Sequence, residues 1–262
     1  MTSAEDSGRI PHPPDGDGGL EGKVIAVAGA GGPAGQATLQ RLAAAGATVV
    51  GADAHAERLE AAVAAARSAH RGATVTGDAV DLLDFAAVQS WAAGTEKEFG
   101  RIDGLVHLVG GWRGARQLTE SALDDWQALH ELLVRTVQHT SLAFRAPLER
   151  SGNGRFVLVS AAAAAKPTAG NAAYAAAKSA AEAWTLALAD AFRKAAGQGP
   201  PPAAAGILVV KALVHDGMRA QRPEAKFAGF TDVTELAENI RRLWALPTEH
   251  VNGNRQWLTP AP

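Results

Sequence analysis

Short apolar segments alternate with longer segments rich in alanine and leucine along most of the chain. The apolar segments end at glycine or at a polar residue, which is typical of strands buried in a parallel sheet. The pattern predicts strands over Lys23–Gly29, Ala47–Asp53, Ala73–Asp81, Gly104–Gly110, Arg155–Ser160, Gly206–Val214 and residues 254–258. It predicts helices over residues 34–45, 55–69, 84–99, 119–149, 171–195 and 232–246.

The alternation of strands and helices predicts an α/β protein with a single Rossmann-type, doubly wound parallel sheet and helices on both faces. Residues 1–20 are rich in Pro, Gly and Asp and lack an apolar core. We therefore expect these residues to form a flexible N-terminal tail. Residues 21–262 are expected to form one folded domain.

The composition limits the classes of function. Hydrophobic residues make up 47% of the 262 residues and charged residues 20%, which suffices to build a buried core. The net charge of -2 gives no general reason to bind nucleic acid or an anionic membrane. The lack of cysteine excludes disulfides, thiolate metal sites and a cysteine nucleophile, and the histidines show no metal-ligand spacing. We expect a cytoplasmic protein that takes a small-molecule substrate and binds no metal.

A glycine-rich turn joins the first predicted strand to the first predicted helix. Its glycines are Gly29, Gly31, Gly32 and Gly35. Such a turn brings backbone N–H groups to a pyrophosphate at the N-terminus of a helix. The alternative is a tight strand–helix turn that binds no ligand.

Acidic residues follow the second and third predicted strands. A carboxylate at Asp53 would accept hydrogen bonds from an adenosine ribose and repel a 2′-phosphate, so it favours NAD(H) over NADP(H). Asp81, with the adjacent Leu82, is a candidate to contact the adenine. The alternative for each carboxylate is a cap on the helix that follows it.

Tyr174 and Lys178 are four residues apart in a predicted helix, so their side chains share one face. An ammonium group beside a phenol is expected to lower the pKa of the phenol, which would then transfer a proton near neutral pH. Such a pair alone is a weak pattern. It gains weight here because it follows a strand in a chain whose first turn already predicts a dinucleotide site.

With these motifs the chain resembles the short-chain dehydrogenase/reductase family over about residues 23–260. The resemblance implies a catalytic, dinucleotide-binding domain in which Gly29 and Gly35 bind the cofactor and Asp53 selects NAD(H). It implies that Tyr174 donates or accepts the proton and that Lys178 binds the nicotinamide ribose and tunes Tyr174. It also implies a homodimer or homotetramer formed through the helices at 119–149 and 171–195.

The chain departs from the family pattern at the catalytic positions. The serine expected 13 residues before Tyr174 is replaced by Ala161. Ser160 is one residue early and, at the end of a strand, is expected to point the other way. The helical asparagine of the family is replaced by Leu133. These losses argue against ordinary oxidation of secondary alcohols.

Other departures resemble one branch, the quinonoid dihydropteridine reductases. The glycine turn contains Pro33, and the family's Asn-Asn-Ala-Gly segment is replaced by His107–Gly110, which keeps Gly110 for the cofactor site. The segments that resemble the branch are Leu105–Ala115, the glycines at 29, 32 and 35, and Pro223–Phe227. In that branch, too, an alanine replaces the serine.

Three further side chains are candidates for the substrate site. Trp112 lies beyond the fourth strand and is predicted either to stack on a flat substrate or to pack under a loop. His215 follows the sixth strand and either reaches the nicotinamide pocket or lies on the surface. Arg113 either meets a substrate carboxylate or is solvated.

The sequence therefore predicts an NAD(H)-dependent oxidoreductase that reduces an electron-poor ring, a C=N bond or a carbonyl-type small molecule. An already electron-poor acceptor needs one proton donor, Tyr174, and no serine. Two alternatives stay open. One is a catalytically silent dinucleotide sensor or scaffold, and the other is a dehydratase or cyclase derived from the same family.

Overall fold

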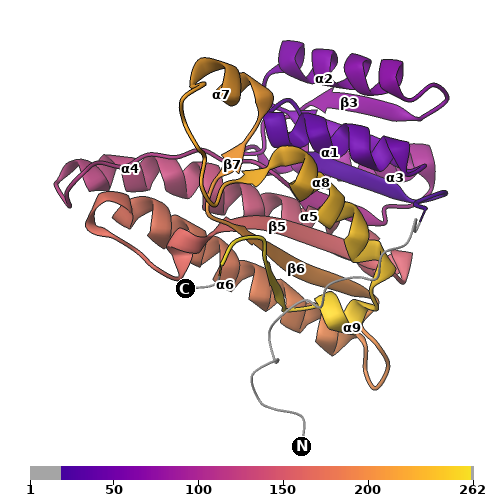
Figure 1. Cartoon of the computed structure of the whole chain (residues 1–262). Coiled ribbons are helices and arrows are strands. Elements are labelled where there is room, and N and C mark those ends of the chain that lie inside the picture. Colours follow the sequence, from indigo (N-terminus) through magenta and orange to yellow (C-terminus); the bar gives the residue numbers. More distant parts are fainter. Residues whose placement is uncertain (1–18, 261–262) are drawn as a thin grey trace, which may run out of the picture.

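The computed structural model describes residues 19–260, and its centre is a seven-stranded parallel sheet with the strand order β3-β2-β1-β4-β5-β6-β9 (Figure 1). The strands are β1 Val24–Ala28, β2 Thr48–Asp53, β3 Val75–Ala79, β4 Gly104–His107, β5 Gly154–Ala161, β6 Ala203–Val210 and β9 Arg255–Trp257. The predicted doubly wound α/β fold is thereby confirmed.

Helices cover both faces of the sheet (Figure 1). They are α1 Pro33–Ala44, α2 Ala56–Ala69, α3 Phe85–Phe99, α4 Ser121–His130, α5 Thr136–Ser151, α6 Ala172–Ala195, α7 Asp216–Gln221, α8 Val233–Arg242 and α9 Thr248–Val251. Alternate residues of β1 show how the sequence builds two cores. Ile25 and Val27 join the core beneath α1, α2 and α8, whereas Val24 and Ala26 join the core beneath α3, α5 and α6.

Three predicted boundaries are corrected by the structure. The predicted tail ends before residue 20, because Leu20 is 2% exposed and its backbone N–H donates to Ala45 at 2.6 Å. Residues 1–18 lie outside the described part. The sixth strand begins at Ala203, because three small alanines fit its buried pairing with β5, and it ends at Val210. The predicted helix over 119–149 is divided into α4 and α5 by a π-helical turn over Glu131–Arg135.

The chain beyond β6 forms a small separate structure at the carboxyl edge of the sheet. Two short strands, β7 Leu213–Val214 and β8 Thr231–Asp232, pair in parallel and bring together the ends of the segment over residues 215–230. Helix α7 lies in this segment and stands above the sheet, and α4 projects sideways from the body (Figure 1). We call residues 215–230 the lid segment.

The opposite, amino edge of the sheet contains two buried charged residues. The Arg155 guanidinium, in β5, donates to the carbonyl oxygens of Leu243 and Leu246 at 3.3 and 2.6 Å, and also to those of residues 153 and 154. The Asp103 carboxylate accepts hydrogen bonds from Arg101, Ser151 and the backbone of residue 24. These bonds fasten the C-terminal segment and the loop before β4 to the sheet.

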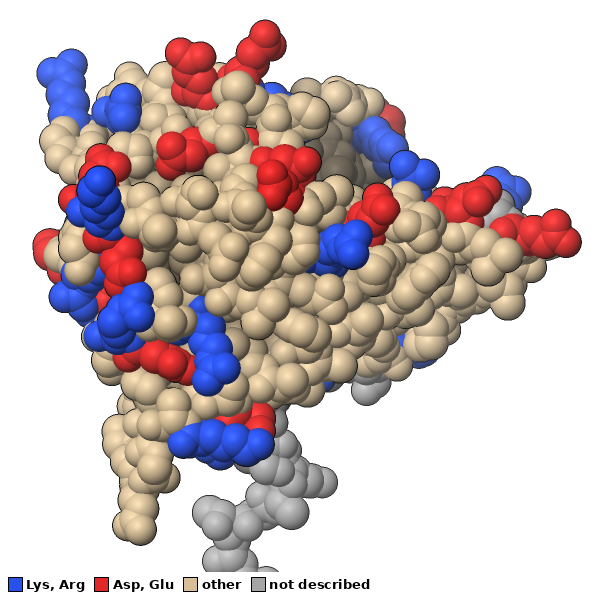
Figure 2. All heavy atoms as spheres, turned by 180° about the vertical axis from the view of Figure 1, so that it is seen from behind, with Lys and Arg blue, Asp and Glu red and all other residues tan. Residues whose placement is uncertain are grey.

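Charge is unevenly spread on the face seen from behind. Charged side chains gather along one edge and are scattered over the upper part of the face, whereas its lower middle carries almost none (Figure 2). Between residues 172 and 187 of α6, the exposed side chains are small, namely Ala176, Ser179, Ala183 and Ala187. Within residues 19–260, no helix is long and apolar enough to cross a membrane.

Candidate active site

A cavity of about 590 Å³ lies at the carboxyl edge of the sheet, where the ends of β5 and β6 and the turn after β1 meet α6 and the lid segment. Because parallel strands end at one edge, residues far apart in sequence converge there. The polar side chains that line it belong to Ser160, Asn171, Tyr174, Lys178, Lys211 and His215. Among the described residues, no Asp or Glu lines this cavity. The cavity therefore suits a ligand with anionic groups.

The glycine turn forms one side of the cavity through Gly29, Gly32 and Gly35. Gly29 has a φ of +83°, and a Cβ there would lie 2.9 Å from the backbone nitrogen of Val109. A Cβ at Gly35 would lie 2.6 Å from the carbonyl oxygen of Ala30. Side chains are thus excluded at these two positions. The N–H groups of Gly29 and Gly32 donate to the carbonyl oxygens of Ala52 and Gly29, so the donors that can reach a pyrophosphate are those of the first turn of α1, at Ala34 and Gly35.

Pro33 departs from the family pattern without distorting this turn. It lies at the first position of α1, where the missing N–H of proline has no partner to lose. Gly31 differs from the expectation, because its N–H donates to the Asp53 carboxylate at 3.0 Å and it does not line the cavity.

Asp53 is buried at the end of β2 and held by three hydrogen bonds. Its carboxylate accepts from the backbone N–H groups of Gly31 and His55 and from the guanidinium of Arg58, the last at 3.0 Å. Residues 54–58 line an open recess of about 420 Å³ beside it. The carboxylate predicted to select NAD(H) therefore has a cation next to it, which the sequence analysis missed.

Asp81 and Leu82 lie outside both of these cavities. The Asp81 carboxylate is exposed and accepts from the backbone N–H of Leu83 at 2.9 Å. Leu82 is buried, and its carbonyl oxygen lies 2.9 Å from Nδ1 of His139. The cap of α3 is Asp84, whose side chain accepts from the N–H groups of residues 86 and 87. Asp81 is therefore not the helix cap that was its alternative interpretation.

Tyr174 and Lys178 lie on one face of α6 and both line the cavity. The Lys178 ammonium lies 6.0 Å from the centre of the Tyr174 ring and donates to the carbonyl oxygen of Val159 at 2.9 Å. Burial lowers the pKa of Lys178 to about 8, although Glu182 opposes this shift.

The expected depression of the tyrosine pKa is wrong for this structure. Burial raises the pKa of Tyr174 to about 12, and the ammonium does not offset it. The reason is that a desolvated phenol ionises less readily, and here the effect of burial exceeds the attraction of the Lys178 ammonium, 6.0 Å from the ring centre. Tyr174 is therefore protonated at neutral pH and carries a proton that it can donate.

Ser160 and Ala161 end β5 beside this pair. The Ser160 hydroxyl donates to the Glu182 carboxylate at 2.6 Å, so it is engaged away from Tyr174. Ala161 is 3% exposed and has no polar group. The other Glu182 oxygen accepts from Arg255 of β9 at 2.8 Å. The position of the expected serine thus offers no second hydroxyl to a substrate.

The π turn lies at the position of the expected asparagine. Leu133, in this turn, is buried in an apolar cluster with Leu129 and Ala177. Just after the turn, the hydroxyl oxygens of Thr136 and Thr140 lie 3.2 Å from Nε2 and Nδ1 of His107. Burial, followed by the charge of Lys178, lowers the pKa of His107 to about 3, so this imidazole stays neutral.

Two of the three substrate candidates, Trp112 and His215, line the cavity. Gly110, Trp112 and His215 line it, and the Trp112 side chain is 64% exposed. Trp112 is therefore not a packing residue under a loop. His215 is half-buried at the N-terminus of α7. Arg113 is exposed and does not line the cavity.

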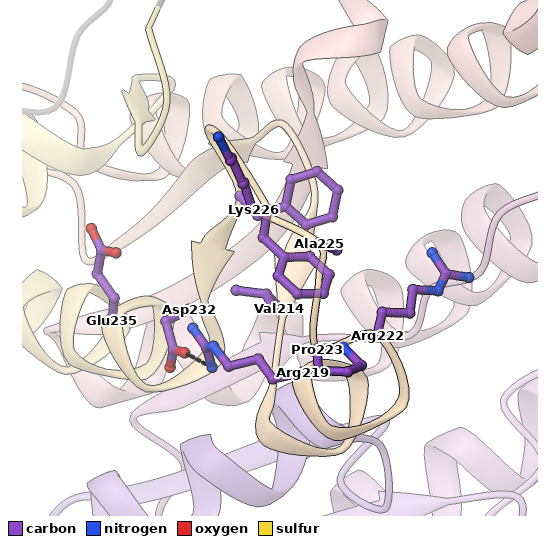
Figure 3. A pocket seen from close by; sticks show the side chains of 10 residues that line it. Val214, Arg219, Arg222, Pro223, Ala225, Lys226, Asp232 and Glu235 are labelled. Carbon is purple, nitrogen blue, oxygen red and sulfur yellow. Dashed lines mark ion pairs between the residues drawn. The ribbon is translucent and has the colours of Figure 1, made fainter.

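A second cavity, of about 470 Å³, lies between the lid segment and residues Val214, Asp232 and Glu235 (Figure 3). It contains Pro223, Ala225 and Phe227 of the segment that resembles the reductase branch. Arg219 pairs there with Asp232 at 2.7 Å, and Arg222 and Lys226 point in different directions (Figure 3). The side chains of Arg222 and Lys226 do not point to a common position, so this cavity lacks the converging polar groups of the main cavity.

Four residues of these sites had no predicted role. Lys211 lines the main cavity, Glu182 and His107 interact electrostatically with Lys178, and Arg58 pairs with Asp53. Glu182 had a readable signal, because it follows Lys178 by the same four-residue step that links Lys178 to Tyr174. Arg58 had no such signal, because it lies on α2 whereas Asp53 ends β2. The contacts of His107 had none, because they join residues of β4 and α5 that no spacing connects.

Comparison with known sequences shows one family. The sequence profile described as short chain dehydrogenase matches residues 23–196. The chain is 36% identical over 166 residues to the short-chain reductase protein NovJ of Streptomyces niveus, covering 63% of this chain and 62% of NovJ. The match thus spans less than two thirds of that relative.

Solved structures share the fold. The short chain dehydrogenase of Burkholderia cenocepacia J2315 in complex with NADP is 27% identical, with a TM-score of 0.76, over 92% of this chain and 97% of that chain. The NAD+-bound xylitol dehydrogenase is 22% identical, with a TM-score of 0.77, over 92% of this chain and 98% of that chain. One neighbour therefore holds NADP and the other NAD+.

Proposed function

The chain belongs to the short chain dehydrogenase family, and we propose that it is an NAD(H)-dependent oxidoreductase that reduces an electron-poor small molecule. One observation carries this proposal. Tyr174 and Lys178 line the same cavity as the glycine turn at the N-terminus of α1. A proton donor and a phosphate cradle thus meet in one space, as a hydride-transfer enzyme requires.

The residues present fit a nicotinamide dinucleotide. The glycine turn leaves backbone N–H groups free of side-chain cover, and Lys178 has further N–H donors beyond the one bound to Val159. The N–H group of Gly35, in the first turn of α1, would hold the pyrophosphate, Gly29 and Gly32 would leave room for its approach, and Lys178 would bind the ribose next to the nicotinamide. When bound, the cofactor supplies the hydride.

Tyr174 would donate the proton that the reduced substrate gains. Its phenol is protonated at neutral pH because burial holds its pKa near 12. A phenol in that state acts as a general acid toward an atom that gains electrons. Lys178, one helical turn away, holds positive charge beside the phenolate that forms.

The missing hydroxyl at Ala161 narrows the substrate class. A simple ketone is polarised best by two donors, whereas a quinonoid ring or an iminium group is already electron-poor. The exposed indole of Trp112 beside the cavity supports a flat substrate. This combination supports the resemblance to the quinonoid dihydropteridine reductases, which stays a prediction.

Cofactor choice depends on Asp53 and Arg58. A buried carboxylate at the end of β2 favours two ribose hydroxyls and disfavours a 2′-phosphate. Arg58 is 56% exposed and bound to that carboxylate, which limits its use by a phosphate. We therefore assign NAD(H) as the preferred cofactor. Fluorescence titration with NADH and NADPH tests this, and tighter binding of NADPH would contradict it.

The alternatives are a silent dinucleotide sensor and a dehydratase or cyclase. A screen of NADH oxidation against quinonoid dihydropterin, quinones, imines and ketones separates them from the reductase. The reductase predicts turnover of an electron-poor acceptor and little turnover of simple ketones. NADH binding without turnover of any acceptor would favour the sensor, whereas substrate conversion without net NADH oxidation would favour the dehydratase or cyclase.

The exposed side chains of α5 and α6 support assembly of two or four copies through α4, α5 and α6. Small exposed residues on α6 permit close helix packing, and Leu142 of α5 is 53% exposed. Light scattering coupled to gel filtration tests this proposal. Ala183→Arg should dissociate the assembly, and a wild-type monomer would contradict it.

A further inference from the structure

Glu182 is a buried carboxylate that lies deep beside the proposed active site and takes no direct part in it. It is 8% exposed, on α6, one helical turn beyond Lys178. Its two oxygens have different partners. Oε1 accepts from the Ser160 hydroxyl at 2.6 Å, and Oε2 accepts from Nε of Arg255 at 2.8 Å.

We infer that Glu182 is a positioning residue for Lys178, whose carboxylate, held by Ser160 and Arg255, keeps the buried lysine cationic at the wall of the cavity. This inference rests on the proposed role of Lys178. A buried ammonium is costly unless an opposite charge lies near it. Glu182 is placed to supply that charge without entering the cavity, which no carboxylate of the described residues lines.

The charged and titratable groups around Lys178 come from several elements. Tyr174 and Glu182 flank it on α6, His107 faces it from β4, and Lys211 lines the same cavity after β6. Tyr174 and His107 are neutral at pH 7, because burial raises the pKa of the first and lowers that of the second. Glu182 is therefore the group of this set that favours the charged lysine, and its field raises the pKa of Lys178 against the effect of burial.

Arg255 competes with Lys178 for the charge of Glu182. It comes from β9, is 30% exposed and shares the single negative charge of Glu182 with Lys178. Removing the carboxylate charge should make Lys178 less basic. Removing Arg255 should do the opposite, because the carboxylate is then no longer partly neutralised. A purely structural bridge between α6 and β9 would be broken by either change and predicts no such opposition.

The test is the titration of Lys178 itself, followed by NMR of protein labelled with 13C at the lysine ε-carbon. The Lys178 signal is identified by its loss in Lys178→Met. We expect Glu182→Gln to lower the pKa of Lys178 by about 1 unit and Arg255→Met to raise it. Asp190→Asn, the same chemical change on an exposed carboxylate of α6, is the matched control and should leave it unchanged.

Activity gives a second measurement. If the reductase needs cationic Lys178, the alkaline limb of kcat/KM should move with the NMR pKa in each variant, and Glu182→Asp should restore it toward wild type. If Glu182→Gln does not fold, Arg255→Met and Glu182→Asp still carry the test. Equal or same-direction shifts in Glu182→Gln and Arg255→Met would overturn the inference. A wild-type protein without turnover would instead overturn the proposed function, since the NMR titration needs no catalysis.

Discussion

Arg155 and Lys178 are buried cations at opposite ends of β5, and they differ in how many hydrogen bonds they donate to the protein. Burial lowers the pKa of Arg155 to about 10 and that of Lys178 to about 8. The Arg155 guanidinium donates to four carbonyl oxygens at the amino edge of the sheet. Lys178 donates to one, that of Val159, and borders the cavity.

The difference lies in the number of hydrogen bonds that offset similar costs of desolvation. A buried cation whose donors are taken up by main-chain carbonyls fixes the fold. A buried cation that keeps N–H donors free beside a cavity can bind a ligand, and its desolvation lowers the stability of the fold. The amino edge of the sheet is therefore expected to control stability, and the carboxyl edge to control binding and reaction rate.

The largest expected effect lies at the carboxyl edge. Tyr174→Phe removes the acidic proton and keeps the ring, so the rate of substrate reduction should fall about 10²–10⁴-fold. NADH affinity and the urea midpoint should stay unchanged, because the phenol is not part of the cofactor cradle. Steady-state kinetics and NADH fluorescence measure both. A variant with full activity would assign the proton to another group.

At the amino edge, Arg155→Met should act on stability alone. It leaves four buried carbonyl oxygens without the guanidinium, and this loss should outweigh the relief of burying the cation, so the free energy of unfolding should fall by about 1–3 kcal/mol. Urea denaturation gives this value, and NADH binding by the folded protein is the control. A stable Arg155→Met protein that loses NADH binding would contradict the expectation that the amino edge controls stability and not binding.

Lys178→Met should change stability in the opposite direction. The pKa of Lys178 is near 8 in the folded chain and about 10.4 in the unfolded chain, so the unfolded chain binds more protons between these pH values. The buried ammonium therefore destabilises the fold most below about pH 8, and this cost falls to zero as the pH rises to about 10.4. Losing the ammonium should stabilise the protein at pH 7 by about 1–2 kcal/mol, after one lost hydrogen bond is counted. The gain should vanish near pH 10.5.

Urea denaturation of wild type and Lys178→Met at the two pH values measures that gain, and NADH titration should show weaker binding by the variant. If Lys178→Met is instead less stable at pH 7, the lysine is a structural residue like Arg155. The carboxyl edge would then control stability through Lys178, as the amino edge does through Arg155.

The smallest effect concerns Asp103 at the amino edge. Burial tends to raise its pKa, but hydrogen bonds from Arg101 and Ser151 and the charge of Lys23 outweigh burial and hold the pKa below its usual range. A depressed carboxyl pKa stabilises the fold above the unfolded value, and this contribution is lost as the pH falls through the folded value. Asp103→Asn should cost about 1 kcal/mol at pH 7 and flatten the loss of stability below about pH 4.

Thermal unfolding between pH 2 and 7 tests that expectation, with NADH affinity as the control. A variant whose acid profile matches wild type would show that other carboxylates dominate acid unfolding.

The sequence determined the fold because strand and helix periods are local properties of the chain. The run from Val24 to Ala28 and the glycines after it specify a buried strand and a phosphate-type turn without reference to any other segment. The step from Tyr174 to Lys178 places two side chains on one helical face in the same way. Elements of this kind were predicted within a few residues of their observed bounds.

Only the tertiary structure decided what surrounds those residues. The pKa of Tyr174 depends on its desolvation, which no spacing predicts, and the cation beside Asp53 depends on how α2 follows β2. The contact of Arg255 with Glu182 joins β9 to α6, and the contact of Thr136 with His107 joins α5 to β4. Burial and long-range pairing arise when the sheet brings distant segments together, so the electrostatics of the site appear only in the folded chain.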